Sequence, residues 1–68
     1  MIAVASSNLA GVDFSDWTGI LTIAFHGGGI YEYVGVPRSV YVGLMQAQSR
    51  GKFFHVHIKN RYNFRRIK

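Results

Sequence analysis

Two tyrosines in this 68-residue chain are spaced so that they could bind planar bases. Tyr31 and Tyr33 are separated by one residue, so in a strand both phenols lie on one face, about 7 Å apart. From there they could stack on bases or donate hydrogen bonds to phosphate oxygens. Aromatic residues are also favoured in strands for packing alone. The pair therefore predicts either a recognition surface or an aromatic part of the core.

The cations that could bind phosphate are concentrated in the C-terminal half. All eight lysines and arginines follow position 37, whereas the three acids, Asp13, Asp16 and Glu32, precede it. Aromatic residues are interleaved with these cations, and guanidinium groups form bidentate contacts with phosphates. A solvated tail is the alternative interpretation. The densest cationic stretch consists of Lys59, Arg61, Tyr62, Arg65 and Arg66. From it we expect Lys59, Arg61, Tyr62 and Arg65 to contact the anion.

Three short polar side chains precede the first expected strand. Ser6, Ser7 and Asn8 could hydrogen-bond a phosphate, or they could cap the turn that the chain makes there. Turn capping is the commoner role of such residues.

Catalytic and metal chemistry find little support. His26, His55 and His57 could ligate a metal, but the chain has no cysteine and only three acids. The triple glycine at 27–29 is not followed by the Gly-Lys-Ser/Thr of a phosphate-binding loop, and no nucleophile elbow occurs. We therefore expect no catalytic residue, no metal and no cofactor.

An antiparallel meander must position the tyrosine pair. Alternating and β-branched runs predict strands at 9–14, 20–26 and 30–34, with turns at 15–19 and 27–29. In the second strand Leu21, Ile23 and Phe25 share one face. Helical spacing then predicts a helix from Pro37 to Ser49, with Gly51 as its stop.

Residues 52–60 fit two different periods. Phe54, Val56 and Ile58 alternate as in a strand, whereas Phe54, Ile58 and Tyr62 lie at helical spacing. We favour a second short helix, because the His and Lys side chains then form one solvated face, and we expect 62–67 to be extended. The fold class is therefore α+β: an antiparallel meander of about three strands followed by one or two short helices and a basic C-terminal segment, all in one domain over 1–68.

A chain of this length has a small core. It buries only about 60% of its unfolded surface, and without cysteine no disulfide can add stability. Its hydrophobic content is 49%, which is high for so small a body, so we expect a homo-oligomer; a monomer with exposed aromatics is the alternative. No apolar run is long enough for a bilayer and residues 1–8 do not look like a signal peptide, so we expect a cytoplasmic protein without a membrane partner.

Several motifs together resemble the KTSC domain family. The tyrosine pair, the Val36-Pro37 step and Gly51-x-Phe53-Phe54 are the most specific, and Ser6-Ser7, Leu21-x-Ile23-x-Phe25-x-x-Gly28 and Ile58-Lys59-x-x-Tyr62 also match. That family is named for its occurrence at the C-terminus of some lysyl-tRNA synthetases. It also occurs as small free-standing proteins and has been suggested to bind RNA. After Phe54 the family favours Asn, whereas this chain has His55, so a ligand contact at that position is not carried over.

The resemblance implies two possible ligands. Free-standing proteins that look like this occur in phages, and they are similar to anti-CBASS sponges, which sequester cyclic dinucleotide immune signals. A cyclic dinucleotide is a two-fold dianion with two bases, so two subunits could offer it matched groups. We expect a non-enzymatic nucleotide-binding protein, most concretely such a phage-type sponge in the cytosol of a bacterial host; the alternative is an RNA-binding module. The expected ligand residues are Ser6, Ser7, Tyr31, Tyr33, Phe54, Lys59, Arg61, Tyr62 and Arg65.

Overall fold

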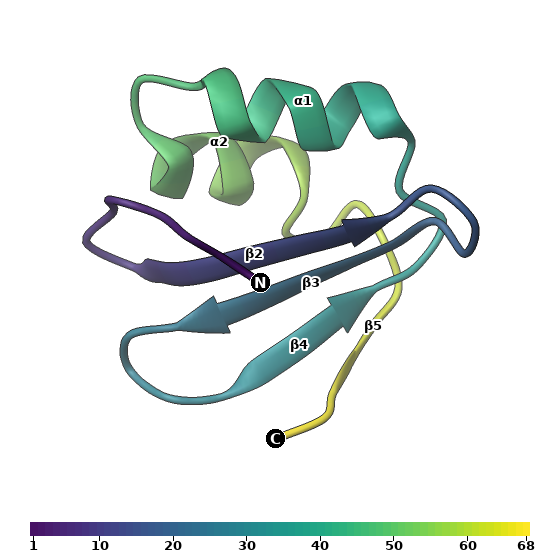
Figure 1. Cartoon of the computed structure of the whole chain (residues 1–68), viewed down its shortest axis with the longest axis horizontal. Coiled ribbons are helices and arrows are strands. Elements are labelled where there is room, and N and C mark those ends of the chain that lie inside the picture. Colours follow the sequence, from purple (N-terminus) through teal and green to yellow (C-terminus); the bar gives the residue numbers. More distant parts are fainter.

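Five strands pair in sequence order into one antiparallel sheet, and both helices lie on the same face of it (Figure 1). This computed structural model describes residues 1–68. The strands are β1 (Ile2–Ala3), β2 (Leu9–Ser15), β3 (Ile20–Phe25), β4 (Ile30–Tyr33) and β5 (Phe64–Arg66). The helices α1 (Arg38–Gln46) and α2 (Arg50–His57) follow β4 in the chain and precede β5. Neither helix could span a bilayer.

The core lies between the sheet and the two helices. Leu21 and Ile23 of β3 are fully buried, and Val12 of β2 is paired opposite Ile23. The period-2 alternation of β3 therefore directs one face of the strand into the core, as the sequence predicted. Leu44 of α1, Phe54 of α2 and Ile58, the C-cap of α2, close the core from the other side.

The tight loop between β3 and β4 depends on glycine. Gly28 and Gly29 have φ angles of 104° and 94°, a left-handed region that residues with a Cβ rarely adopt. The predicted hairpin at 27–29 is thus confirmed, and it brings Tyr31 opposite Ile23 across the β3–β4 pair.

The helical region divides differently from the prediction. Pro37 is the N-cap of α1, and α1 ends at Gln46, before the predicted end at Ser49. Ser49 instead caps α2, its hydroxyl accepting a hydrogen bond from the backbone N–H of Lys52 at 3.3 Å. The prediction that Gly51 ends a helix is wrong, because the Ser49 cap starts a new helix that contains Gly51. The predicted second helix is confirmed as α2, although α2 begins two residues before and ends three residues before the predicted range of 52–60.

The sheet has five strands where the sequence indicated about three. The expected extended segment at 62–67 contains β5, which pairs with β4 and joins the sheet as its edge. At the opposite edge the short β1 pairs with β2 through Ile2 and Ala3. Both added strands have only two or three residues, so neither is long enough to produce a recognisable alternation.

Candidate ligand-binding pocket

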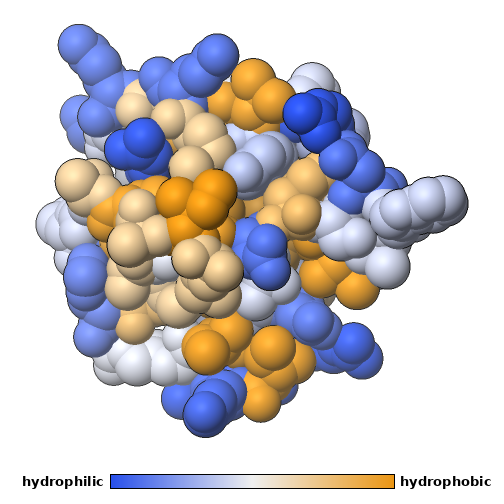
Figure 2. All heavy atoms as spheres, in the orientation of Figure 1, coloured by the Kyte–Doolittle hydropathy of each residue, from blue (hydrophilic) through white to orange (hydrophobic).

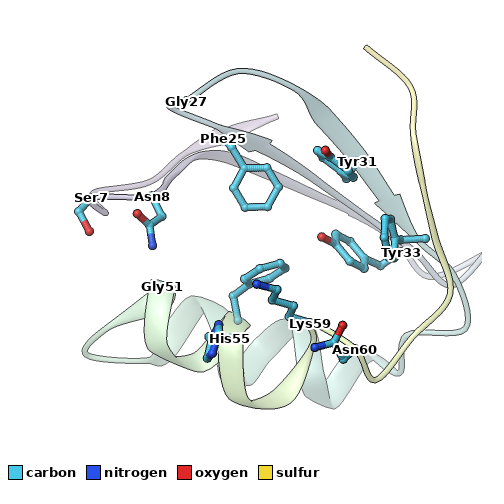
Figure 3. A pocket seen from close by; sticks show the side chains of 12 residues that line it. Ser7, Asn8, Phe25, Gly27, Tyr31, Tyr33, Gly51, His55, Lys59 and Asn60 are labelled. Carbon is cyan, nitrogen blue, oxygen red and sulfur yellow. The ribbon is translucent and has the colours of Figure 1, made fainter.

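A cavity of about 520 Å³ lies between the sheet and α2 (Figure 3). Aromatic rings form much of its wall, and small polar or basic side chains complete it. Twelve residues line the cavity: Ser7, Asn8, Phe25, Gly27, Tyr31, Tyr33, Gly51, Phe54, His55, Lys59, Asn60 and Phe64.

The aromatic wall is one connected cluster of rings. The Phe54 ring of α2 meets Phe25 and Tyr33 edge to face, with centroids 5.4 and 5.5 Å apart. Tyr31 packs against Phe25 at 5.5 Å, and Phe64 of β5 lies 5.8 Å from Tyr31 and 5.6 Å from Tyr33. Rings fixed in this way offer a planar ligand both flat surfaces and edges without first having to be ordered.

Strand register explains why these rings converge. Tyr33 is paired with Leu21 on β3 and with Phe64 on β5, so all three side chains share the face covered by the helices. Tyr31 is paired in the same way with Ile23 and Arg66. The Arg66 guanidinium lies 5.9 Å from the Tyr31 ring centroid, which is the distance of a cation–π contact.

The polar part of the cavity carries positive charge without a carboxylate. Lys59 extends toward the space between α2 and the sheet, and His55 lies against α2 at the cavity wall (Figure 3); no acidic residue lines the cavity. Of the two ion pairs in the structure, one joins Arg38 to Asp16 and the other joins Arg65 to Glu32, so the Lys59 ammonium is not neutralised by either. An anion entering the cavity would meet an uncompensated cation.

The phenol of Tyr33 stays neutral over an extended pH range. Burial, and secondarily charge repulsion from the ionised form of the neighbouring Tyr31, raises the pKa of Tyr33 to about 12. The hydroxyl therefore remains a hydrogen-bond donor at every physiological pH and does not add negative charge beside Lys59.

Two shallower hollows adjoin the cavity. One shares Ser7, Asn8, Gly51 and His55 with it and continues toward the start of α2, where Lys52 lines it. The other shares Asn60 and Phe64 and is lined in addition by Arg61, Tyr62 and Asn63. Together the three form a track from the start of α2 to β5, and no acidic residue lines any part of it.

The structure brings together five of the nine residues expected from the sequence: Ser7, Tyr31, Tyr33, Phe54 and Lys59. Ser6 lies beside the cavity and caps the turn, its hydroxyl accepting hydrogen bonds from the backbone N–H groups of Asn8 and Leu9.

The remaining three expected residues lie outside the cavity. Arg61 and Tyr62 line the adjoining hollow. Arg65 is paired with Glu32 across β4 and β5, 2.8 Å from its carboxylate, on the sheet face away from the helices. Alternation along β5 therefore directs Arg66, rather than Arg65, toward the tyrosines.

Several lining residues were not predicted as ligand contacts. Phe25 follows Leu21 and Ile23 on one strand face, and this alternation is the signal that could have placed it. Asn8 was one of three residues that the sequence offered for hydrogen-bonding a phosphate, but it was not among the nine expected ligand residues, and neither was His55. Phe64 and Asn60 gave no local signal, because their place depends on how β5 pairs with β4. The histidines do not form part of any group of three metal-ligating side chains.

The fold and cavity define a small α+β domain in which a meander sheet carries a helix pair on one face. The KTSC domain family matches residues 5–62, so the chain belongs to that family, as its motifs predicted. The crystal structure of a KTSC domain protein from Yersinia pestis has the same fold. It has a TM-score of 0.95 and 33% sequence identity, and the match covers 97% of this chain and 93% of that one.

Similar sequences occur in two settings. A protein of Stutzerimonas stutzeri described as uncharacterized is 33% identical over 67 residues, covering 97% of this chain and 94% of that protein. Lysine–tRNA ligases are 35% identical over 54 residues in Trichormus variabilis and 42% over 50 residues in Nostoc punctiforme. These matches cover 79% and 74% of this chain but 10% and 9% of the ligases, so the chain spans about a tenth of their length.

Proposed function

We propose that this protein binds a nucleotide in the cavity between the sheet and α2 and does not transform it. One observation carries the proposal: a cluster of five aromatic rings faces a polar wall that contains Lys59 and His55 and no carboxylate. The base would stack on the rings, and the phosphate would meet the Lys59 ammonium. Base stacking on aromatic side chains contributes about 1–3 kcal/mol per base, and a cavity of about 520 Å³ lies within the usual range of small-ligand sites.

The most concrete form of this function is sequestration of a cyclic dinucleotide. Retention of such a signal needs tight binding and no catalytic group, and the ligand's two bases and two phosphates match two equivalent cavities. This form of the proposal therefore requires a homo-oligomer with at least two cavities. It places the protein in the cytoplasm, which would be that of a bacterial host if a phage encodes the protein.

Binding of single-stranded RNA is the second candidate. Two observations favour it: the cavity continues into hollows lined by Lys52 and Arg61, and similar segments occur in enzymes named as lysine–tRNA ligases. Along such a track a base would enter the aromatic cavity while neighbouring phosphates contact the cations on either side.

A direct titration separates these ligands. Cyclic dinucleotides, a mononucleotide and a six-nucleotide RNA would be titrated at about 150 mM salt, where weak non-specific attraction is screened. Recovery of unaltered cyclic dinucleotide after submicromolar binding would support sequestration, whereas binding of the RNA alone would select the second candidate. If none of the three binds, the proposed function is wrong.

Substitutions in the cavity test the assigned contacts. Tyr31→Ala should weaken binding about tenfold because it removes a stacking surface, while Tyr31→Phe keeps the ring and should retain most of the affinity. Lys59→Gln should weaken binding at least tenfold, since a charge-assisted contact contributes about 1.5–3 kcal/mol.

Arg38→Gln is the matched charge control for Lys59→Gln. It removes one positive charge at α1, where Arg38 pairs with Asp16 outside the cavity. Equal losses for Arg38→Gln and Lys59→Gln would mean that net charge, and not the cavity, controls binding.

A further inference from the structure

The sheet face away from the helices has no layer packed against it. Both helices lie on the other face (Figure 1), and Figure 2 shows apolar side chains on the surface around the N-terminal strand and along the part of the molecule away from the helices. Strand register places two parallel rows of side chains on this open face that cross the sheet from β2 to β5, and a shorter row of Ser15 and Ile20 beside them.

The first row is apolar. Gly11, Ala24 and Ile30 are consecutive partners across β2, β3 and β4. Ile67 continues the row beyond β5, since its N–H donates to the Ile30 carbonyl at 2.8 Å. Met1 covers Gly11: a Cβ at that position would lie 2.6 Å from the Met1 sulfur. Met1 and Ile67 are 61% and 49% exposed, so both ends of the row present apolar surface to solvent.

The second row is polar and its charges are arranged asymmetrically. Asp13, Thr22, Glu32 and Arg65 are consecutive partners across β2 to β5. Arg65 pairs with Glu32, whereas Asp13 has no cationic partner, and its carboxylate accepts a hydrogen bond only from the neighbouring Phe14 N–H. An unpaired anion thus lies at one end of the row and a cation at the other.

We propose that this open face binds a second copy of the same chain, sheet against sheet. A two-fold axis parallel to the strands, between β3 and β4, places β2 of one copy over β5 of the other and β3 over β4. The Asp13 carboxylate of each copy then lies beside Arg65 of the other copy, so the same ion pair forms twice in the dimer. Self-complementarity of this kind is what a two-fold interface requires.

The same axis also matches the apolar rows. Ala24 faces the larger Ile30 of the second copy, and Met1 faces Ile67, so small and large side chains interdigitate as they do between aligned sheets. Each copy contributes the face of a five-stranded sheet, which would cover apolar surface that a chain of 68 residues cannot bury alone.

This dimer leaves the cavities open and separates them. Each cavity lies between the sheet and α2, on the face opposite to the proposed interface. The two copies would therefore bind one ligand each, on opposite outer surfaces. A cyclic dinucleotide held between two cavities would require a second interface, on the helix side, in addition to this one. Dimerisation and ligand binding can consequently be measured independently.

Sedimentation equilibrium at about 100 μM protein would test the interface. The native chain should be a dimer, and Ala24→Glu should be monomeric, because it places an unpaired charge at the centre of the contact. Val56→Glu makes the same kind of change on the exposed side of α2 and should remain dimeric. Circular dichroism and urea unfolding would verify that each variant is folded.

A charge exchange tests the orientation even if Ala24→Glu fails to fold. In a dimer of the Asp13→Lys variant, the new cation lies beside Arg65 of the second copy. In a dimer of the Arg65→Glu variant, the new anion lies beside Asp13 of the second copy. Each variant should therefore dimerise at least tenfold more weakly than the native chain. In an equimolar mixture of the two variants, a mixed dimer pairs the two introduced charges with each other and the native Asp13 with the native Arg65. Both contacts then join opposite charges, so the mixed dimer should form in preference to either homodimer. A monomeric native chain, a dimeric Ala24→Glu variant or a mixture no tighter than its components would each overturn the proposal.

Discussion

A single buried phenol links the cavity to the stability of the fold. Tyr33 packs against Phe54 and Phe64, and its hydroxyl points into the space between the sheet and α2 (Figure 3). The position that places this ring in the cavity also removes it from water, which is why its pKa rises to about 12.

Alkaline pH should therefore destabilise the protein through Tyr33. The unfolded chain loses this proton near pH 10, whereas the folded chain keeps it up to about pH 12. Between these values the folded state binds more protons, so the free energy of unfolding falls as pH rises; below pH 10 this contribution is fully present. Urea unfolding at pH 8, 10 and 11 would measure the loss. Tyr33→Phe should make the free energy of unfolding fall less steeply with pH over this range. Tyr62→Phe, which leaves Tyr33 in place, should not change that dependence.

Residue patterns alone could not identify the arginine that faces the tyrosines. Arg65 and Arg66 are adjacent and chemically identical, and consecutive side chains of a strand point to opposite faces. Only the pairing of Phe64 with Tyr33 decides that Arg66 lies beside Tyr31 and that Arg65 pairs with Glu32. The tyrosine pair was predictable, because two residues with one between them share a face in any register.

At the scale of elements, the sequence predicted those that carry their own periodic signal. β3 and α1 were foreseeable, since their side chains alternate or recur at helical spacing over six and nine residues, whereas the residues of α2 fitted both a strand and a helix period. β1 and β5 contain two and three residues, and they are strands only because β2 and β4 offer them unpaired backbone groups. The cavity shares this dependence, because Phe64 of β5 forms part of its wall.

The start of α2 should be sensitive to its cap. The Ser49 hydroxyl accepts the Lys52 N–H, and no acidic residue in the first turn supplies a second stabilising interaction. Ser49→Ala should therefore lower the free energy of unfolding by about 1 kcal/mol. Ser39→Ala in α1 is the control, because no side-chain cap bond supports the start of that helix. Thermal or urea unfolding of the two variants would give the comparison, and equal stabilities would rule out a capping role for Ser49.

At the scale of the whole molecule, the acidic residues of the sheet and the cations that line the cavity and its hollows lie on opposite sides of the sheet. Asp13 and Glu32 lie on the open face, while the cavity and its adjoining hollows on the helix side are lined by Lys52, Lys59 and Arg61 without any acid. The net charge of +5 thus understates the positive potential that an anionic ligand would meet on the helix side.

Salt dependence should reveal how much of this track a ligand uses. Each phosphate of a single-stranded RNA that is neutralised changes the slope of log K against log salt by about −0.7, so contacts to these three cations predict a slope of roughly −2. A mononucleotide confined to the cavity should give a smaller slope. Arg61→Gln should reduce the RNA slope by about 0.7 and leave mononucleotide binding unchanged, because Arg61 lines only the adjoining hollow. If the native chain and Arg61→Gln gave the same RNA slope, the RNA would contact only the aromatic cavity. If Arg38→Gln lowered the RNA slope as much as Arg61→Gln does, the effect would come from net charge and not from a contact at Arg61.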